Sequence, residues 1–105
     1  TGAQTISGGT FSLNGSNWTL AGAFANTATV QLKGSETVGG VVQDTDSGTW
    51  VYAGDGDGNV DTYTIKDFGT TDYYHLTIAG TDSGDIFQLG VTLTLASGAT
   101  MTVSG

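Results

Sequence analysis

Six segments of the chain share one pattern: an apolar residue, any residue, an apolar residue, any residue, and glycine. In an extended chain the first and third side chains point to the same side, so each copy predicts a short strand with one apolar face. The closing glycine suits the turn after such a strand, because glycine adopts positive φ without steric cost. The copies occupy residues 11–15, 18–22, 30–34, 50–54, 76–80 and 101–105. The alternation of Val91, Leu93 and Leu95 with threonines predicts a further strand over 91–95.

The spacing of the copies favours a β-solenoid, in which each turn of the chain stacks its apolar residues on the next turn. Successive copies begin 7, 12, 20, 26 and 25 residues apart. The three long gaps suit one full turn, and the two short gaps suit successive sides of a turn. An antiparallel β-sandwich or jelly roll is the alternative, because short strands with a turn signal about every 8–12 residues are typical of those folds. In a solenoid, we expect the irregular residues 36–72 to leave the stack as a loop.

The composition indicates an all-β fold in one domain, residues 1–105. The chain has 18 glycines, 19 threonines and no proline. Threonine is β-branched and favours strands, whereas Glu, Lys and Arg, which cover helix surfaces, are nearly absent. The chain also has no cysteine, which excludes disulfides and thiolate metal sites.

The charge is strongly one-sided and limits the partners. Nine Asp and one Glu oppose Lys33 and Lys66, which gives a net charge of -8. Such a surface repels phosphate backbones and anionic headgroups, so we expect no nucleic acid among the partners. No apolar stretch approaches the ~20 residues that a membrane span needs, so we expect no membrane insertion. The same charge favours metal cations.

The amino-acid pattern of the strands resembles a known class of repeat. Residues 4–15, 18–24, 29–34, 73–80 and 87–95 are similar to the Gly/Thr/Asn-rich strand repeats of large bacterial surface proteins, including the β-helical passenger and adhesin repeats of autotransporters. The resemblance implies an exported stalk, adhesin or surface-layer module without catalytic residues. We therefore expect a non-enzymatic, extracellular structural or adhesion module of a surface protein, filament or virion surface. Its terminal strands, at 4–7 or at 100–103, are expected to contact neighbouring copies or modules.

The densest chemical signal is a run of oxygen-bearing side chains at every second position, with glycine in two of the three gaps: Asp55, Asp57, Asn59 and Asp61. Each i, i+2 pair puts a ligand on the concave side of a tight loop, and Ca²⁺ takes about six to eight oxygens from carboxylates, carbonyls and water. The loop departs from an EF-hand, because Val60 replaces its glycine and Lys66 its final glutamate. The two alternatives are a calcium site, in which the ion relieves the charge repulsion, and a plain turn with solvated carboxylates.

Two further acidic pairs lie in turn-like segments. Asp44 and Asp46 join the calcium site if their loop meets residues 55–61, and Asp82 and Asp85 form another turn of the same kind. Each of these four is more typical of a turn residue than of a metal ligand.

Aromatic residues gather in the same part of the chain. Trp50, Tyr52, Tyr73 and Tyr74 are candidate contacts for sugar rings, which makes a carbohydrate-binding module that binds glycans the alternative function. Against this, alternate rings can point into the core, and the consecutive Tyr73 and Tyr74 face opposite ways in a strand. The single histidine, His75, lies in mid-strand with no nucleophile-elbow motif beside it, so we predict no catalytic residues.

Overall fold

The computed structural model of the protein describes residues 4–20, 22–69 and 71–104. Within these ranges the chain forms short strands and no helix, which confirms the all-β prediction. The described residues accordingly contain no helix of the length and apolarity that a membrane crossing requires. The strands are β1 (Gln4–Ile6), β2 (Thr10–Ser12), β3 (Trp18–Thr19), β4 (Phe24–Asn26), β5 (Thr29–Leu32), β6 (Val38–Gly39), β7 (Thr49–Tyr52), β8 (Thr62–Ile65), β9 (His75–Ala79), β10 (Ile86–Leu89) and β11 (Met101–Ser104).

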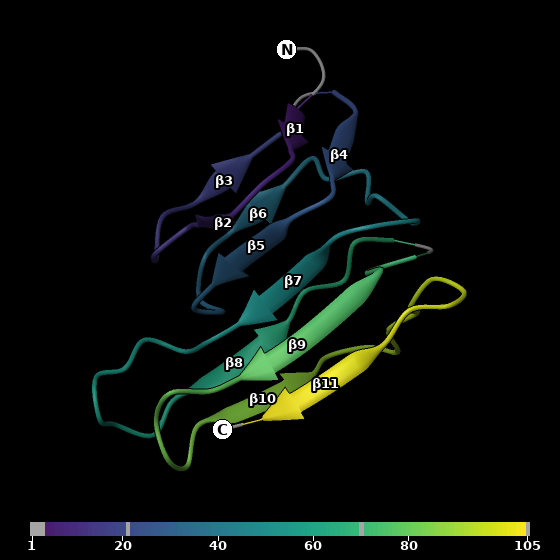
Figure 1. The fold of residues 1–105 in the computed structure, drawn as a ribbon. Coiled ribbons are helices and arrows are strands. Elements are labelled where there is room, and N and C mark those ends of the chain that lie inside the picture. Colours follow the sequence, from purple (N-terminus) through teal and green to yellow (C-terminus); the bar gives the residue numbers. More distant parts are fainter. Residues whose placement is uncertain (1–3, 21, 70, 105) are drawn as a thin grey trace.

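Five strands form the main sheet, in the order β2-β5-β7-β9-β11 (Figure 1). All neighbours are parallel, and one ladder joins Phe11, Val30, Trp50, Leu76 and Met101. These residues are the first apolar positions of five of the six repeated segments. The copies are therefore stacked in register, as expected for the turns of a solenoid.

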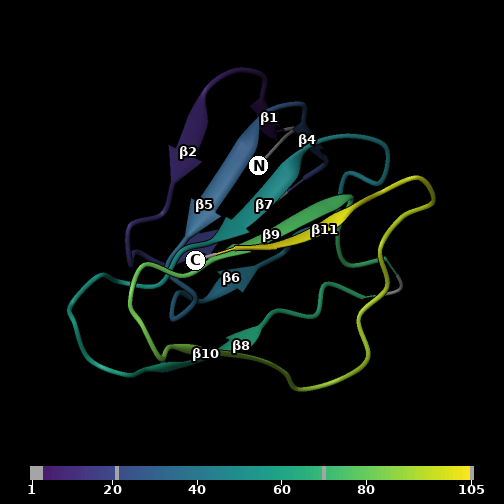
Figure 2. The same ribbon diagram turned by 60° about the horizontal axis from the view of Figure 1, so that its bottom comes forward.

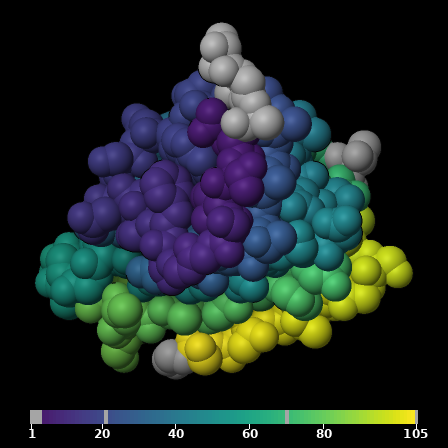
Figure 3. All heavy atoms as spheres, turned by 45° about the horizontal axis from the view of Figure 1, so that its top comes forward, coloured from purple at the N-terminus to yellow at the C-terminus, as the bar shows by residue number. Residues whose placement is uncertain are grey.

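The sixth copy lies on another side of the molecule, where Trp18 in β3 pairs with Val38 in β6. Further along the stack β8 pairs with β10, and a third side consists of the β1–β4 pair and an isolated bridge between Tyr73 and Leu95. In Figure 2, β6, β8 and β10 lie opposite the main sheet. About four turns stack in this way, which confirms the predicted β-solenoid. In Figure 3 the turns form successive bands of colour from purple to yellow.

Close approach of the turns requires glycine just before the main sheet. Gly48 precedes β7 with a φ of 89°, and a Cβ built there would overlap the backbone oxygen of Asn26 in the preceding turn. The hydroxyl of Ser47 donates to the same oxygen at 2.9 Å. Only glycine combines this backbone conformation with the absence of a side chain.

The core is a stack of apolar side chains centred on Trp50. Its ring centroid lies 6.4 Å from that of Trp18, 6.2 Å from that of Phe24, 5.1 Å from that of Phe68 and 5.9 Å from that of Tyr73. Trp50 itself is 1% exposed. Aromatic rings bury large apolar areas, so this cluster fills the interior of a narrow solenoid with few side chains.

Two sequence-based expectations are wrong. Residues 36–72 do not leave the stack as one loop, because β6 completes the second turn and β7 and β8 build the third. The strand predicted at 91–95 does not form, and of these residues only Leu95 makes a bridge. Pairing with the neighbouring turn decides both outcomes, since strands this short have no stability of their own.

Candidate functional site

The corner that follows the main sheet differs in length between turns. In the first two turns it spans residues 13–17 and 33–37, five residues each. In the third turn it spans residues 53–61, nine residues, and in the fourth residues 80–85, six residues. The two longer corners are stacked on each other, and together they carry five of the nine aspartates.

A single buried carboxylate closes the short corners. Glu36 is 2% exposed, and its Oε2 accepts hydrogen bonds from the backbone N–H of Gly15 and of Lys33, both at 2.9 Å. Its Oε1 accepts from the N–H of Gly34 at 2.8 Å. Burial acts to raise the pKa of Glu36, but the backbone hydrogen bonds outweigh burial and hold that pKa below its ordinary value of 4.5. Both oxygens of this carboxylate therefore have protein partners.

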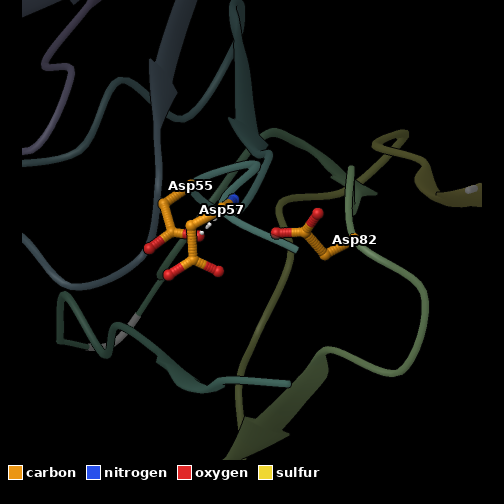
Figure 4. A group of neighbouring side chains, drawn as sticks. All are labelled: Asp55, Asp57 and Asp82. Carbon is orange, nitrogen blue, oxygen red and sulfur yellow. Dashed lines mark hydrogen bonds between the residues drawn. The ribbon is translucent and has the colours of Figure 1, made fainter. Parts of the chain in front are cut away.

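At the long corners the carboxylates face one another instead. Asp55 and Asp57 follow β7, whereas Asp82 follows β9 in the next turn. One oxygen from each of the three lies within 4.8 Å of the other two. Figure 4 shows the side chain of Asp82 directed toward the loop that carries Asp55 and Asp57.

Asp61 and Asp85 extend this group toward the interior. The N–H of Asp61 donates to Oδ1 of Asp85 at 2.9 Å. The Oδ2 atoms of Asp61, Asp82 and Asp85 are buried and accept no hydrogen bond. Burial, followed by the charges of the four other aspartates, raises the pKa of Asp61. We call these five residues the acidic corner: Asp55, Asp57, Asp61, Asp82 and Asp85.

Tyr63 lies against the acidic corner. It is 5% exposed, and its ring stacks on that of Phe87 with the centroids 5.2 Å apart. Its hydroxyl is buried and has no hydrogen-bond partner. Burial, with the charges of Asp55, Asp61 and Asp85, raises the pKa of Tyr63 to about 12. A Cβ built on Gly54 would lie 3.7 Å from Cε2 of Tyr63 and 2.8 Å from Oδ2 of Asp85, so the hydroxyl end of the ring lies beside the acidic corner.

The structure brings together a different set of acidic residues from the metal ligands that the sequence predicts. Asn59 is exposed, and its backbone N–H and its side-chain amide donate to the carboxylate of Asp57 at 2.8 and 3.1 Å, as in a turn. Asp44 accepts a hydrogen bond from the N–H of Asn26 at 2.7 Å, on another side of the solenoid, so Asp44 and Asp46 do not join the acidic corner. Asp82 and Asp85 join it, and no pattern in the sequence marked Tyr63 as part of it.

Three of the four rings proposed to contact glycans lie in the core, which corrects that prediction. Trp50 is 1% exposed, and Tyr52 and Tyr73 are 0% exposed, so their faces are closed to a sugar. Tyr74 is half-buried beside His75, and Nδ1 of His75 lies 3.1 Å from the backbone N of Thr100, which donates to it.

The two ends of the stack are a second candidate site. Phe11 at one end is 40% exposed, and Met101 and Val103 at the other are 52% and 71% exposed. A hollow of about 420 Å³ at the second end is lined by Ile78, Phe87, Val103 and the corner at 80–85. Each end therefore presents exposed apolar side chains beside a hollow.

In comparisons with known proteins, no family model, no curated protein and no solved structure matches the chain.

Proposed function

We propose that the protein is a non-enzymatic structural module of an exported surface assembly, and that it acts by stacking its ends on other copies. The proposal rests on the side-chain exposure along the main-sheet ladder that begins at Phe11 and ends at Met101. Val30, Trp50 and Leu76 are at most 1% exposed, whereas the end members of the ladder are 40% and 52% exposed. Each end thus presents an apolar side chain at a position that a neighbouring turn covers elsewhere in the fold.

The backbone of the edge strands supports the same proposal. β2 and β11 each have one neighbour in the main sheet. The outer edge of such a strand offers N–H and C=O groups to another strand. Because every ladder is parallel, β2 of one copy can add to β11 of another in the direction and register of a further turn. This head-to-tail contact uses two different surfaces and does not close, so it produces filaments rather than dimers.

The other sides of the solenoid add apolar surface to the two ends. At the C-terminal end, Ile86 and Leu89 of β10 are 51% and 56% exposed. At the N-terminal end, Phe11, Trp18 and Ile6 help to line a hollow of about 210 Å³. Burying these side chains against each other is the driving force that we expect for association.

The extracellular setting rests on the resemblance of the strands to bacterial adhesin repeats. A rigid stack with threonines and aspartates on its exterior suits a spacer or stalk, because the negative charge keeps single modules soluble.

Cysteine cross-linking tests the stacked arrangement directly, since the chain has no cysteine of its own. Ser12 in β2 and Thr102 in β11 occupy the same exposed position of the ladder. Head-to-tail stacking brings their Cα atoms to about 5 Å, within disulfide range, whereas about 19 Å separates them inside one chain. The double variant Ser12→Cys/Thr102→Cys is expected to form disulfide-linked multimers under mild oxidation.

The matched control is Ser12→Cys/Thr45→Cys, because Thr45 is exposed but lies between β6 and β7, away from both edges. This pair is expected to stay monomeric. Multimers of equal yield from both pairs would show random collision and overturn the stacked arrangement.

Sedimentation at increasing protein concentration tests the apolar ends. Val103 and Val42 are both 71% exposed, but Val42 lies between β6 and β7 and Val103 lies on β11. Val103→Asp is expected to abolish association, and Val42→Asp is expected to leave it unchanged. A wild-type protein that stays monomeric at all concentrations, or equal loss in both variants, contradicts the proposal.

A further inference from the structure

We propose that the acidic corner binds one calcium ion, with ligands from two successive turns of the solenoid. The third turn contributes Asp55, Asp57 and Asp61, and the fourth contributes Asp82 and Asp85. This site differs from the single-loop site that the sequence suggests, because it takes in the fourth turn and leaves out Asn59. It does not depend on the stacking of copies.

The buried polar atoms distinguish the acidic corner from an ordinary group of surface carboxylates. Tyr63 is only 5% exposed, and its hydroxyl lacks a hydrogen-bond partner. One oxygen each of Asp61, Asp82 and Asp85 is also buried without a partner. Native proteins rarely leave buried polar atoms unpaired, so each such atom calls for a ligand or a water. Glu36, at the equivalent corner of an earlier turn, has protein donors for both of its oxygens.

The distances within the group suit calcium. Oxygens that bind one Ca²⁺ at about 2.4 Å lie at most about 4.8 Å apart, on opposite sides of the ion. The oxygens of Asp55, Asp57 and Asp82 already lie within that separation of one another. An ion between them would thus need little movement of the two loops.

The type of donor also favours calcium. All the donors are hard oxygens on two irregular loops, which matches the flexible coordination of Ca²⁺ better than the near-ideal octahedron that Mg²⁺ demands. We expect the hydroxyl of Tyr63 to donate to a ligating carboxylate or to a water on the ion, which orients that ligand. The ion would then tie the corners of the third and fourth turns together.

A calorimetric titration of the purified protein with CaCl₂ tests the site. It is carried out in about 0.15 M KCl, because salt screens the diffuse attraction of Ca²⁺ to the negatively charged surface. One saturable site per chain is expected, together with a rise in Tm of about 10 °C at a hundredfold excess over Kd. Tb³⁺ provides an independent probe, because its emission on tyrosine excitation requires a nearby ring. We expect Tyr63 to sensitise bound Tb³⁺ and Ca²⁺ to displace it.

Three isosteric or small substitutions separate the two-turn site from its alternatives. Asp82→Asn is expected to weaken Ca²⁺ binding about tenfold or more. Asn59→Ala and Asp46→Asn are expected to leave the affinity unchanged, since Asn59 lies outside the ligand set and Asp46 on another side. Asp85→Asn, at the other fourth-turn ligand, serves as the second variant if Asp82→Asn does not fold.

Three results would overturn the proposal. The first is the absence of saturable Ca²⁺ binding by the wild-type protein. The second is wild-type affinity in Asp82→Asn with loss in Asn59→Ala, which would indicate a single-loop site. The third is equal weakening by Asp46→Asn and Asp82→Asn, which would indicate diffuse charge screening.

Discussion

Glu36 accepts a hydrogen bond from the backbone N–H of Gly15, 21 positions earlier in the chain, at 2.9 Å. With its bonds to the N–H groups of Lys33 and Gly34, it joins the corners of two successive turns. Replacing the carboxylate by a neutral amide, which also presents donors to donors, leaves buried N–H groups poorly paired. We predict that Glu36→Gln lowers the free energy of unfolding by about 1.5–3 kcal/mol in urea titrations at neutral pH.

The same contact predicts a dependence on pH. The pKa of Glu36 is lowered in the folded state, so as the pH falls the unfolded chain binds the proton first. The stabilisation is therefore complete above the ordinary pKa of 4.5 and is lost as the pH falls through the lower folded pKa. The stability curves of wild type and Glu36→Gln are expected to converge in acid. A constant difference down to low pH would contradict this assignment.

A second prediction concerns two tyrosines in the core. The hydroxyls of Tyr52 and Tyr73 lie 2.6 Å apart, the N–H of Lys66 donates to Tyr52, and the hydroxyl of Tyr73 donates to the carbonyl of Lys66. Tyr73→Phe leaves the carbonyl of Lys66 without its donor and the hydroxyl of Tyr52 without its acceptor. The expected loss of unfolding free energy is about 1–3 kcal/mol, measured by urea titration.

This pair also predicts a loss of stability in alkali. Burial is the main cause that raises the pKa of Tyr52 to about 12, and it raises the pKa of Tyr73 as well. A raised folded pKa means that the stabilisation is complete below pH 10 and is lost as the pH rises above the ordinary pKa of 10. Phenolate absorbance and circular dichroism are expected to change together. Ionisation of these two rings without loss of the fold would refute the network.

The third prediction compares two residues at the same position of the repeat. Leu76 and Met101 are neighbours in the main ladder, but Leu76 is 0% exposed and Met101 is 52% exposed. In dilute protein, Leu76→Ala is expected to lower the free energy of unfolding by about 2–5 kcal/mol. Met101→Ala is expected to change it by no more than about 0.5 kcal/mol. Thermal or urea unfolding measures both. Similar costs at the two positions would mean that the C-terminal strand is covered in solution.

The fourth prediction concerns the unpaired hydroxyl at the acidic corner. Tyr63→Phe keeps the ring stacked on Phe87 and removes a buried hydroxyl that has no partner. In EDTA the variant is expected to be as stable as wild type or more stable, by up to about 1 kcal/mol. Tyr73→Phe is the control, since the same change there removes a hydrogen-bonded hydroxyl and is expected to lower the free energy of unfolding. A clear loss of stability in Tyr63→Phe would show that the hydroxyl has a protein partner.

The sequence predicts the ladder well because its signal is local. Alternation within five residues decides which side chains share a face. In the five copies whose closing glycine the structure describes, that glycine follows the strand, at Gly15, Gly22, Gly34, Gly54 and Gly80. The isolated alternation at 91–95 fails, because a strand this short forms only where a neighbouring turn pairs with it. Four of those five residues make no such pair in the structure.

The sequence by itself therefore determined the all-β class and the faces of the repeated strands, because these depend on spacing within one repeat. It favoured the solenoid over the sandwich through the spacing between repeats, and the structure decided between them. Only the tertiary structure decided which residues of different turns meet. The length of each corner sets how many positions separate residues that lie beside each other in successive turns. A change of a few residues in that separation would give each polar side chain different hydrogen-bond partners. That separation brings Asp61 to Asp85, 24 positions away, buries Glu36 among backbone amides and turns Trp50 and Tyr73 into the core.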